Sequence, residues 1–181
     1  PFLTYTMSDE RTMENAGRYL QEAGADGVKL EGGRTVAPTV RRLVQAGIPV
    51  LGHVGILPQS VLAEGGYRVR GRSREEADAL REDVLALQDA GAFGVVFEGM
   101  PTELSRELTD SLSIPTIGIG AGPHCGGQIQ VVHDILGLDP GFCPKHARRY
   151  ARLGEAMQDA IAVYVDDVSQ GRFPGEDESF A

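Results

Sequence analysis

Residues 93–98 have the sequence FGVVFE, a short apolar run that closes on a carboxylate. A run of this length, bounded by glycine and rich in β-branched and aromatic residues, is typical of a strand that is buried on both faces. Glycine or proline also marks the ends of most other short apolar runs in the chain. We therefore expect further strands at 27–31, 48–53, 114–119 and 128–133.

Helical patterns fill the intervals between these runs. The clearest covers 74–90, where apolar residues recur at spacings of three and four and form one stripe of a helix. Ser73 followed by Glu76 matches a capping box at its start, and Gly91 is a natural stop. Further helical patterns lie at 8–23, at 101–112 and, as one or two helices, within 145–170.

The alternation of strands and helices predicts an α/β protein with a parallel sheet and helices packed outside it. Two architectures fit this pattern, a doubly wound open sheet and a (β/α)8 barrel. A dinucleotide-binding sheet needs Gly-x-Gly-x-x-Gly near its first strand. The glycine cluster of this chain, at 118–122, has a different spacing and is followed by Pro123, which argues against dinucleotide binding.

Composition limits the classes of partner. The chain has 181 residues and a formal net charge of −9, which argues against the broad basic face that nucleic acid or an anionic membrane requires. No apolar run approaches the roughly 20 residues of a membrane span. Two cysteines, Cys125 and Cys143, are too few for a disulfide framework, so a reducing cytoplasm is the expected location. The chain opens on Pro1, which suggests an interior segment of a longer protein.

Polar residues stand at the C-terminal ends of the expected strands. Lys29 and Glu31 end the first, His53 the second, Glu98 the third and His133 the fifth, while the glycine cluster follows the fourth. Barrel enzymes place catalytic groups at these ends, so one pocket can collect them. Each feature also has an ordinary structural interpretation. The glutamates would be solvated, Lys29 would pair with Glu31, His53 would be a core histidine, and the glycines would form a tight turn.

Several longer motifs follow one another in a specific order. They are VKLEGG at 28–33, GHVGILPQS at 52–60, GGYRVRGR at 65–72, FEGMP at 97–101, IPTIGIGAG at 114–122 and GRFPGE at 171–176. This ordered set resembles the ketopantoate hydroxymethyltransferase (3-methyl-2-oxobutanoate hydroxymethyltransferase) family. The likeness runs along the whole chain, from Pro1 to Ala181.

The resemblance implies a (β/α)8 TIM barrel of the phosphoenolpyruvate/pyruvate type. Residues 1–181 would be a single domain, the C-terminal two-thirds of that barrel, with about five βα units plus C-terminal helices. The implied reaction transfers a hydroxymethyl group from 5,10-methylenetetrahydrofolate to the α-keto acid 3-methyl-2-oxobutanoate, giving 2-dehydropantoate for pantothenate and coenzyme A synthesis. It depends on Mg²⁺, which stabilises an enolate, and members of the family form homo-oligomers, typically decamers.

Carried over residue by residue, the resemblance places Glu31 in the Mg²⁺ site, Lys29 on the keto acid, Glu98 as the proton acceptor and His53 as a hydrogen-bond donor to the substrate. In the family, an Asp that ligates Mg²⁺ immediately precedes the Pro-Phe at which this chain opens, and a second Asp lies further upstream. Neither is in this sequence, which retains Glu31 alone of the three carboxylates. We therefore expect the N-terminal third of the barrel to be missing.

Two alternatives stay open at this point. A C–C lyase or mutase of the same barrel superfamily would share the enolate chemistry, but it would use a nucleophilic cysteine in a mobile loop. Neither Cys125 nor Cys143 has the neighbours expected of such a residue. The missing aspartates also allow an inactive, truncated paralogue that serves as a structural subunit.

Overall fold

The computed structural model describes residues 1–63 and 65–180, and the chain divides into two compact units. The first unit covers residues 1–129 and contains the sheet, while the second covers 130–181 and is helical. Compactness alone does not define a folding domain. The interpretation of residues 1–181 as a single domain therefore stays a prediction.

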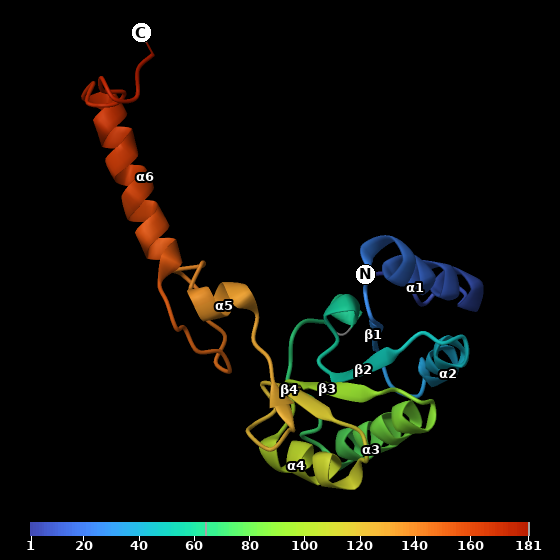
Figure 1. Cartoon of the computed structure of the whole chain (residues 1–181). Coiled ribbons are helices and arrows are strands. Elements are labelled where there is room, and N and C mark those ends of the chain that lie inside the picture. Colours follow the sequence, from blue (N-terminus) through green and yellow to red (C-terminus); the bar gives the residue numbers. More distant parts are fainter. Residues whose placement is uncertain (64, 181) are drawn as a thin grey trace. The chain divides into compact units, whose positions relative to one another are not determined.

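The sheet of the first unit is parallel, and its five strands follow one another in chain order (Figure 1). A doubly wound sheet reverses its strand order at a switch point, and this order has no reversal. The strand order is therefore the one expected of consecutive units of a (β/α)8 barrel. The strands are β1 (Val28–Glu31), β2 (Val50–Gly55), β3 (Gly94–Glu98), β4 (Thr116–Ile119) and β5 (Gly127–Gln128).

Helices alternate with the first four strands, as the sequence predicts. The three helices predicted in this unit are confirmed to within one residue at each end, and a further helix occupies the interval between β1 and β2. Ser73 caps the longest of them, because its Oγ accepts a hydrogen bond from the Glu76 N–H at 3.2 Å. The helices are α1 (Asp9–Ala23), α2 (Ala37–Gln45), α3 (Arg74–Asp89) and α4 (Thr102–Ser111).

The hydrophobic core lies between the sheet and helices α2, α3 and α4. Alternate residues of the central strands point to this side, where Gly52 of β2 leaves room for a helix side chain. A Cβ at Gly52 would lie 2.8 Å from Leu87 Cδ1 of α3. Burial of apolar surface is the dominant favourable term in folding. The core includes Val50, Val54, Val95 and Phe97 from the strands and Val40, Leu43, Leu80, Val84, Leu87, Leu104 and Leu108 from the helices.

The prediction of a strand over 128–133 is wrong beyond its first residue. β5 ends at Gln128, and the apolar residues that follow are largely exposed before the short helix α5 (Val132–Leu136) begins. Gly137 ends this helix in the left-handed conformation, with φ 61°. β-branched residues favour a strand only where the sheet buries them. His133 accordingly lies on a helix and not at the end of a strand.

The longest element of the second unit is α6 (Leu153–Ser169), which fills the latter part of the interval where the sequence predicts one or two helices. Tyr164 of α6 packs edge-on against Phe173, with ring centroids 5.4 Å apart. Across the residues that the structure describes, helices fall short of the length and apolar character needed to cross a membrane.

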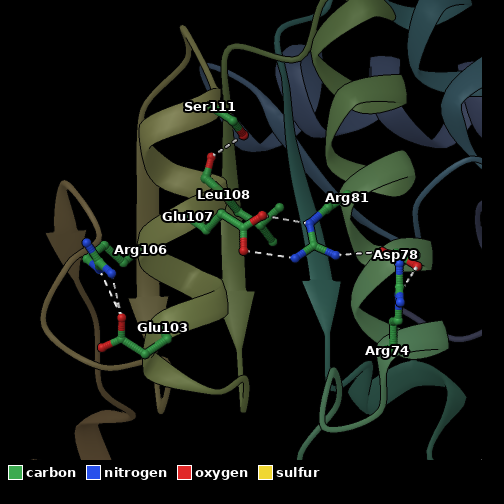
Figure 2. Close-up of polar contacts among 8 residues, drawn as sticks. All are labelled: Arg74, Asp78, Arg81, Glu103, Arg106, Glu107, Leu108 and Ser111. Carbon is green, nitrogen blue, oxygen red and sulfur yellow. Dashed lines mark hydrogen bonds and ion pairs between the residues drawn. The ribbon is translucent and has the colours of Figure 1, made fainter.

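Ion pairs join the exposed sides of α3 and α4 (Figure 2). The Arg81 guanidinium lies 2.8 Å from each carboxylate oxygen of Glu107 on α4 and 2.7 Å from Asp78 on its own helix. Arg106 pairs with Glu103 one turn earlier on α4. Exposed pairs of this kind contribute about 0–1 kcal/mol each. We therefore attribute the position of these helices to the core beneath them.

Phe97 tests this assignment of the core. Its side chain is fully buried, so Phe97→Ala is expected to lower the free energy of unfolding by about 3–5 kcal/mol. Phe93, just before the same strand, is 52% exposed, and Phe93→Ala is expected to change the free energy of unfolding by about 0.5 kcal/mol or less. Urea unfolding followed by circular dichroism measures both variants. Equal losses for the two would contradict the assignment.

Candidate active site

The polar residues predicted at the first three strand ends lie on one face of the sheet. β1 and β2 pair with Glu31 opposite His53, and β2 and β3 pair with Glu98 opposite Gly55, two residues beyond His53. Side chains alternate between the two faces along a strand. Lys29, Glu31, His53 and Glu98 therefore all point away from the face that packs against the helices. The structure brings these four predicted residues together.

His53 stands at the centre of this group. Its Nδ1 lies 3.1 Å from Lys29 Nζ and 3.8 Å from Glu31 Oε1. Its Nε2 lies 3.2 Å from Glu98 Oε2. Lys29 Nζ is also 3.4 Å from Glu31 Oε1. The imidazole thus connects a lysine of the first strand with a glutamate of the third.

Burial differs across the group. The side chains of His53 and Glu31 are 2% and 7% exposed, whereas those of Glu98 and Lys29 are 19% and 44% exposed. A buried carboxylate is costly unless it is paired or hydrogen-bonded. Glu31 meets this requirement, because its Oε2 accepts a hydrogen bond from the Gln59 backbone N–H at 2.9 Å and its Oε1 faces the Lys29 ammonium. The structural pairing of Lys29 with Glu31 is therefore present.

The Nε2 atom of His53 is buried and has no hydrogen bond among the described residues. Glu98 Oε2 lies within 3.2 Å, but the direction of this contact is not that of a hydrogen bond. Catalytic hydrogen bonds are often poorly aligned before the substrate binds. A buried polar atom without a partner is rare in a folded protein. This nitrogen is therefore better explained by a ligand than by His53 acting only as a core residue.

Two residues that the sequence did not single out adjoin the group. Tyr5 and Gln59 line a cavity of about 340 Å³ together with Lys29 and Glu31. Burial raises the pKa of the Tyr5 phenol, and the Glu31 carboxylate raises it further, so the hydroxyl stays protonated at neutral pH. Gln59 lies in a short 3₁₀ turn. Its place within the motif at 52–60 is the feature of the sequence that points to it. Tyr5 lies in the opening segment, where no periodicity marks it.

The described residues do not by themselves form a magnesium site. Across residues 1–63 and 65–180, no three His, Cys, Asp or Glu side chains are grouped as metal ligands. Mg²⁺ requires near-octahedral oxygen coordination. Glu31 offers two oxygens, of which one accepts the Gln59 N–H and the other lies beside the Lys29 ammonium. The role of Glu31 as a Mg²⁺ ligand stays a prediction.

Glu76 anchors a segment that runs beside the site. Its carboxylate accepts hydrogen bonds from two backbone N–H groups just before α3, at 3.0 and 3.2 Å, and from the Arg68 guanidinium at 2.7 Å. The bond from Arg68 is the main cause that holds the pKa of Glu76 below its ordinary value. The same segment is tied to the turn after Glu98, because the Arg70 N–H donates to the Gly99 carbonyl at 2.9 Å.

The glycine cluster after β4 forms a turn that side chains would obstruct. Gly120 and Gly122 have φ values of 64° and 79°, in the region that favours glycine. A Cβ at Gly122 would also lie 2.6 Å from the Thr102 side chain of α4. Packing and turn geometry therefore account for these glycines, in keeping with the tight-turn interpretation.

A family model described as ketopantoate hydroxymethyltransferase matches residues 1–176. The chain belongs to this family. Its relatives named 3-methyl-2-oxobutanoate hydroxymethyltransferase are 56% identical in Chloroflexus aurantiacus, 52% in Moorella thermoacetica and 49% in Chlorobium phaeobacteroides. Each match covers 99% of this chain but only 63%, 67% and 65% of the relative, in the same order. The chain thus spans about two thirds of the length of these ketopantoate hydroxymethyltransferase relatives.

The family predicted from the ordered sequence motifs is therefore confirmed. Among solved structures, the chain is similar to a Burkholderia cenocepacia J2315 protein proposed to be a phosphonomutase. That match has a TM-score of 0.49 and 16% identity, and it covers 92% of this chain and 66% of the other. Because this score is below 0.5, the fold assignment rests on the strand order described above.

Glu76→Gln tests the anchor beside the site. Because the pKa of Glu76 is lowered from its ordinary value of 4.5, its carboxylate stabilises the segment fully at pH values above 4.5. This stabilisation is lost as the pH falls through the lowered pKa. We expect faster hydrogen exchange at the amides of Gly71 and Arg72 in the variant at neutral pH. The wild-type protein should approach the same behaviour in acid, after correction for intrinsic exchange.

The adjacent variant Glu75→Gln is the control for this prediction, and it should leave both amides unchanged. Exchange that is equally slow in the wild type and in Glu76→Gln at neutral pH would show that the carboxylate does not hold the segment.

Proposed function

We propose that this protein catalyses a hydroxymethyl transfer in which 5,10-methylenetetrahydrofolate donates a one-carbon unit to 3-methyl-2-oxobutanoate and 2-dehydropantoate is formed. The family match and the names of the relatives support the reaction class. The observation that carries the proposal is the Glu98 carboxylate 3.2 Å from the buried Nε2 of His53, at the edge where parallel strands collect catalytic groups. The reaction belongs to pantothenate and coenzyme A synthesis.

Glu98 is the proposed general base. The C3–H bond of the keto acid breaks, its electrons form the C2–C3 double bond of an enolate, and the C2=O electrons move to the oxygen. C3 then bonds to the one-carbon unit while the two bonds from that carbon to the folate nitrogens break, so that water supplies the hydroxyl group and tetrahydrofolate leaves. Of the two site glutamates, Glu98 is the more exposed, while Glu31 is held by Gln59 and Lys29. Glu98 is therefore the carboxylate better placed to accept the proton.

Lys29 and His53 are the proposed substrate-binding residues. The Lys29 ammonium is partly exposed on the same face, so it can pair with the carboxylate of the keto acid. We assign the Nε2–H of His53 as the donor to the oxygen that gains negative charge when the proton leaves. A fixed donor at that position stabilises the developing charge without reorganisation of water.

Mg²⁺, a homo-oligomeric assembly such as a decamer, and a cytoplasmic location are proposed on the family resemblance. Glu31 would contribute one carboxylate to the metal. Because the described residues do not complete that site, each step above uses only Glu98, Lys29 and His53. The α-keto acid and the folate are the proposed small-molecule partners.

Glu98→Gln tests the assignment of the base in the protein as its gene encodes it. The amide cannot accept the C3 proton, so turnover is expected to fall by about 10²–10⁴-fold. Binding of 3-methyl-2-oxobutanoate, measured by calorimetry, should stay within about threefold of the wild type because Lys29 and His53 are unchanged. Glu103→Gln, on the exposed surface of α4, is the control and should keep full activity.

Three other results would replace this proposal. Activity that survives in Glu98→Gln would mean that another group removes the proton. A wild-type protein that binds the keto acid but never turns it over would favour the interpretation as an inactive structural subunit. Cleavage of a substrate without folate would favour the C–C lyase or mutase.

A further inference from the structure

The contact between Lys29 and His53 determines which ring nitrogen carries the proton. A lysine ammonium has three N–H donors and no acceptor. Lys29 Nζ lies 3.1 Å from His53 Nδ1, so Nδ1 can take part in this contact only as the acceptor. A neutral imidazole that accepts at one nitrogen carries its hydrogen on the other. The geometry therefore places the hydrogen on Nε2.

The competing arrangement has poorer geometry. It would put the hydrogen on Nδ1 and direct it to the Glu31 carboxylate, but Nδ1 and Glu31 Oε1 are 3.8 Å apart. That separation is beyond hydrogen-bond length. The same Glu31 oxygen lies closer to Lys29 Nζ, at 3.4 Å. The lysine thus stands between the histidine and the carboxylate that would otherwise attract the hydrogen.

The position of the hydrogen on His53 determines whether the ring presents a donor or an acceptor beside Glu98. Nε2 faces Glu98 Oε2 at 3.2 Å, and the His53 side chain is only 2% exposed. With the hydrogen on Nε2, the ring presents a donor to the space beside the base. With the hydrogen on Nδ1, the same space would contain two acceptors, a bare nitrogen and a carboxylate, which repel each other and any substrate oxygen.

We propose that Lys29 is a positioning residue as well as a ligand for the substrate: through its contact with Nδ1 it keeps the hydrogen of His53 on Nε2, where the donor faces Glu98 and the substrate oxygen. The consequence for turnover rests on the proposed function. The position of the hydrogen in the free protein does not, so it can be tested separately.

The direct test is solid-state NMR of the protein as its gene encodes it, labelled with ¹⁵N-histidine. The other histidines of this chain, His124, His133 and His146, are exposed. The His53→Gln variant identifies the His53 signals by their loss. We expect an unprotonated Nδ1 and a protonated Nε2 in the wild type. A hydrogen on Nδ1, or on both nitrogens, would overturn the proposal from the wild-type spectrum alone.

Substitutions at Lys29 test the cause. In Lys29→Met the donor to Nδ1 is lost, and the hydrogen is expected to move in part to Nδ1, towards Glu31. In Lys29→Arg a guanidinium donor remains, and the wild-type pattern is expected to return. A far-ultraviolet circular dichroism spectrum and a urea midpoint like those of the wild type show that each variant is folded. A His53 pattern in Lys29→Met identical to the wild type would overturn the positioning role.

Steady-state kinetics separates the two roles of the lysine. If Lys29 only bound the keto acid, Lys29→Met would raise KM, and saturating substrate would restore kcat. With the positioning role, kcat at saturation is also expected to fall, by about tenfold or more, because the donor beside the base is no longer fixed. Restored kcat would overturn this part. A wild-type protein without transferase activity would refute the proposed function and leave the NMR result valid.

Discussion

A single imidazole ring and the parallel register around it hold the site together. Neighbouring strands of a sheet lie about 4.8 Å apart, so His53, on the middle of three strands, contacts both neighbours at once. Its Nδ1 reaches Lys29 of β1 and its Nε2 reaches Glu98 of β3. A slip of β2 by one residue would turn the ring to the helix side of the sheet. Lys29 and Glu98 would then lose the group that connects them.

The main chain at the ends of β2 and β3 fixes that register. Gly55 has φ 97°, and a Cβ there would lie 2.1 Å from the carbonyl oxygen of Glu98, so this position excludes a side chain. The next residue, Ile56, donates its N–H to the same carbonyl at 2.8 Å. The backbone of Glu98 is therefore held by the strand that carries His53. A base attached to a fixed main chain needs little further ordering when the substrate arrives.

The first four strands can be predicted to within two residues, because each is a short run, bounded by glycine or proline, whose apolar residues the sheet buries wholly or in part. The fifth cannot, since a similar run lies exposed and gives way to a helix. The site residues can be predicted because parallel strands end at one edge. Their contacts cannot: the position of His53 between Lys29 and Glu98 depends on register. Tyr5 and Gln59 come from segments that have no hydrophobic period.

Burial of polar groups at this site lowers the stability of the fold. Hydrogen-bond partners offset this cost for the Glu31 carboxylate but not for the Nε2 atom of His53. Glu31 has the Gln59 N–H and the Lys29 ammonium as partners, whereas Nε2 of His53 has no hydrogen bond within the described chain. An unsatisfied buried donor costs about 1–3 kcal/mol. One donor at a developing oxyanion lowers a barrier by about 2.7–4 kcal/mol.

The first quantity lowers the stability of the fold and the second lowers the barrier of the reaction, so leaving this nitrogen without a partner in the free protein favours catalysis at a cost in stability. If Nε2 and Glu98 instead formed a well-aligned hydrogen bond before the substrate bound, that bond would have to break before either group could act. Their close but misaligned contact, 3.2 Å apart, avoids this barrier. The same argument explains why the ring is held from its other side: contact with Lys29 restrains Nδ1 and leaves Nε2 available to the substrate.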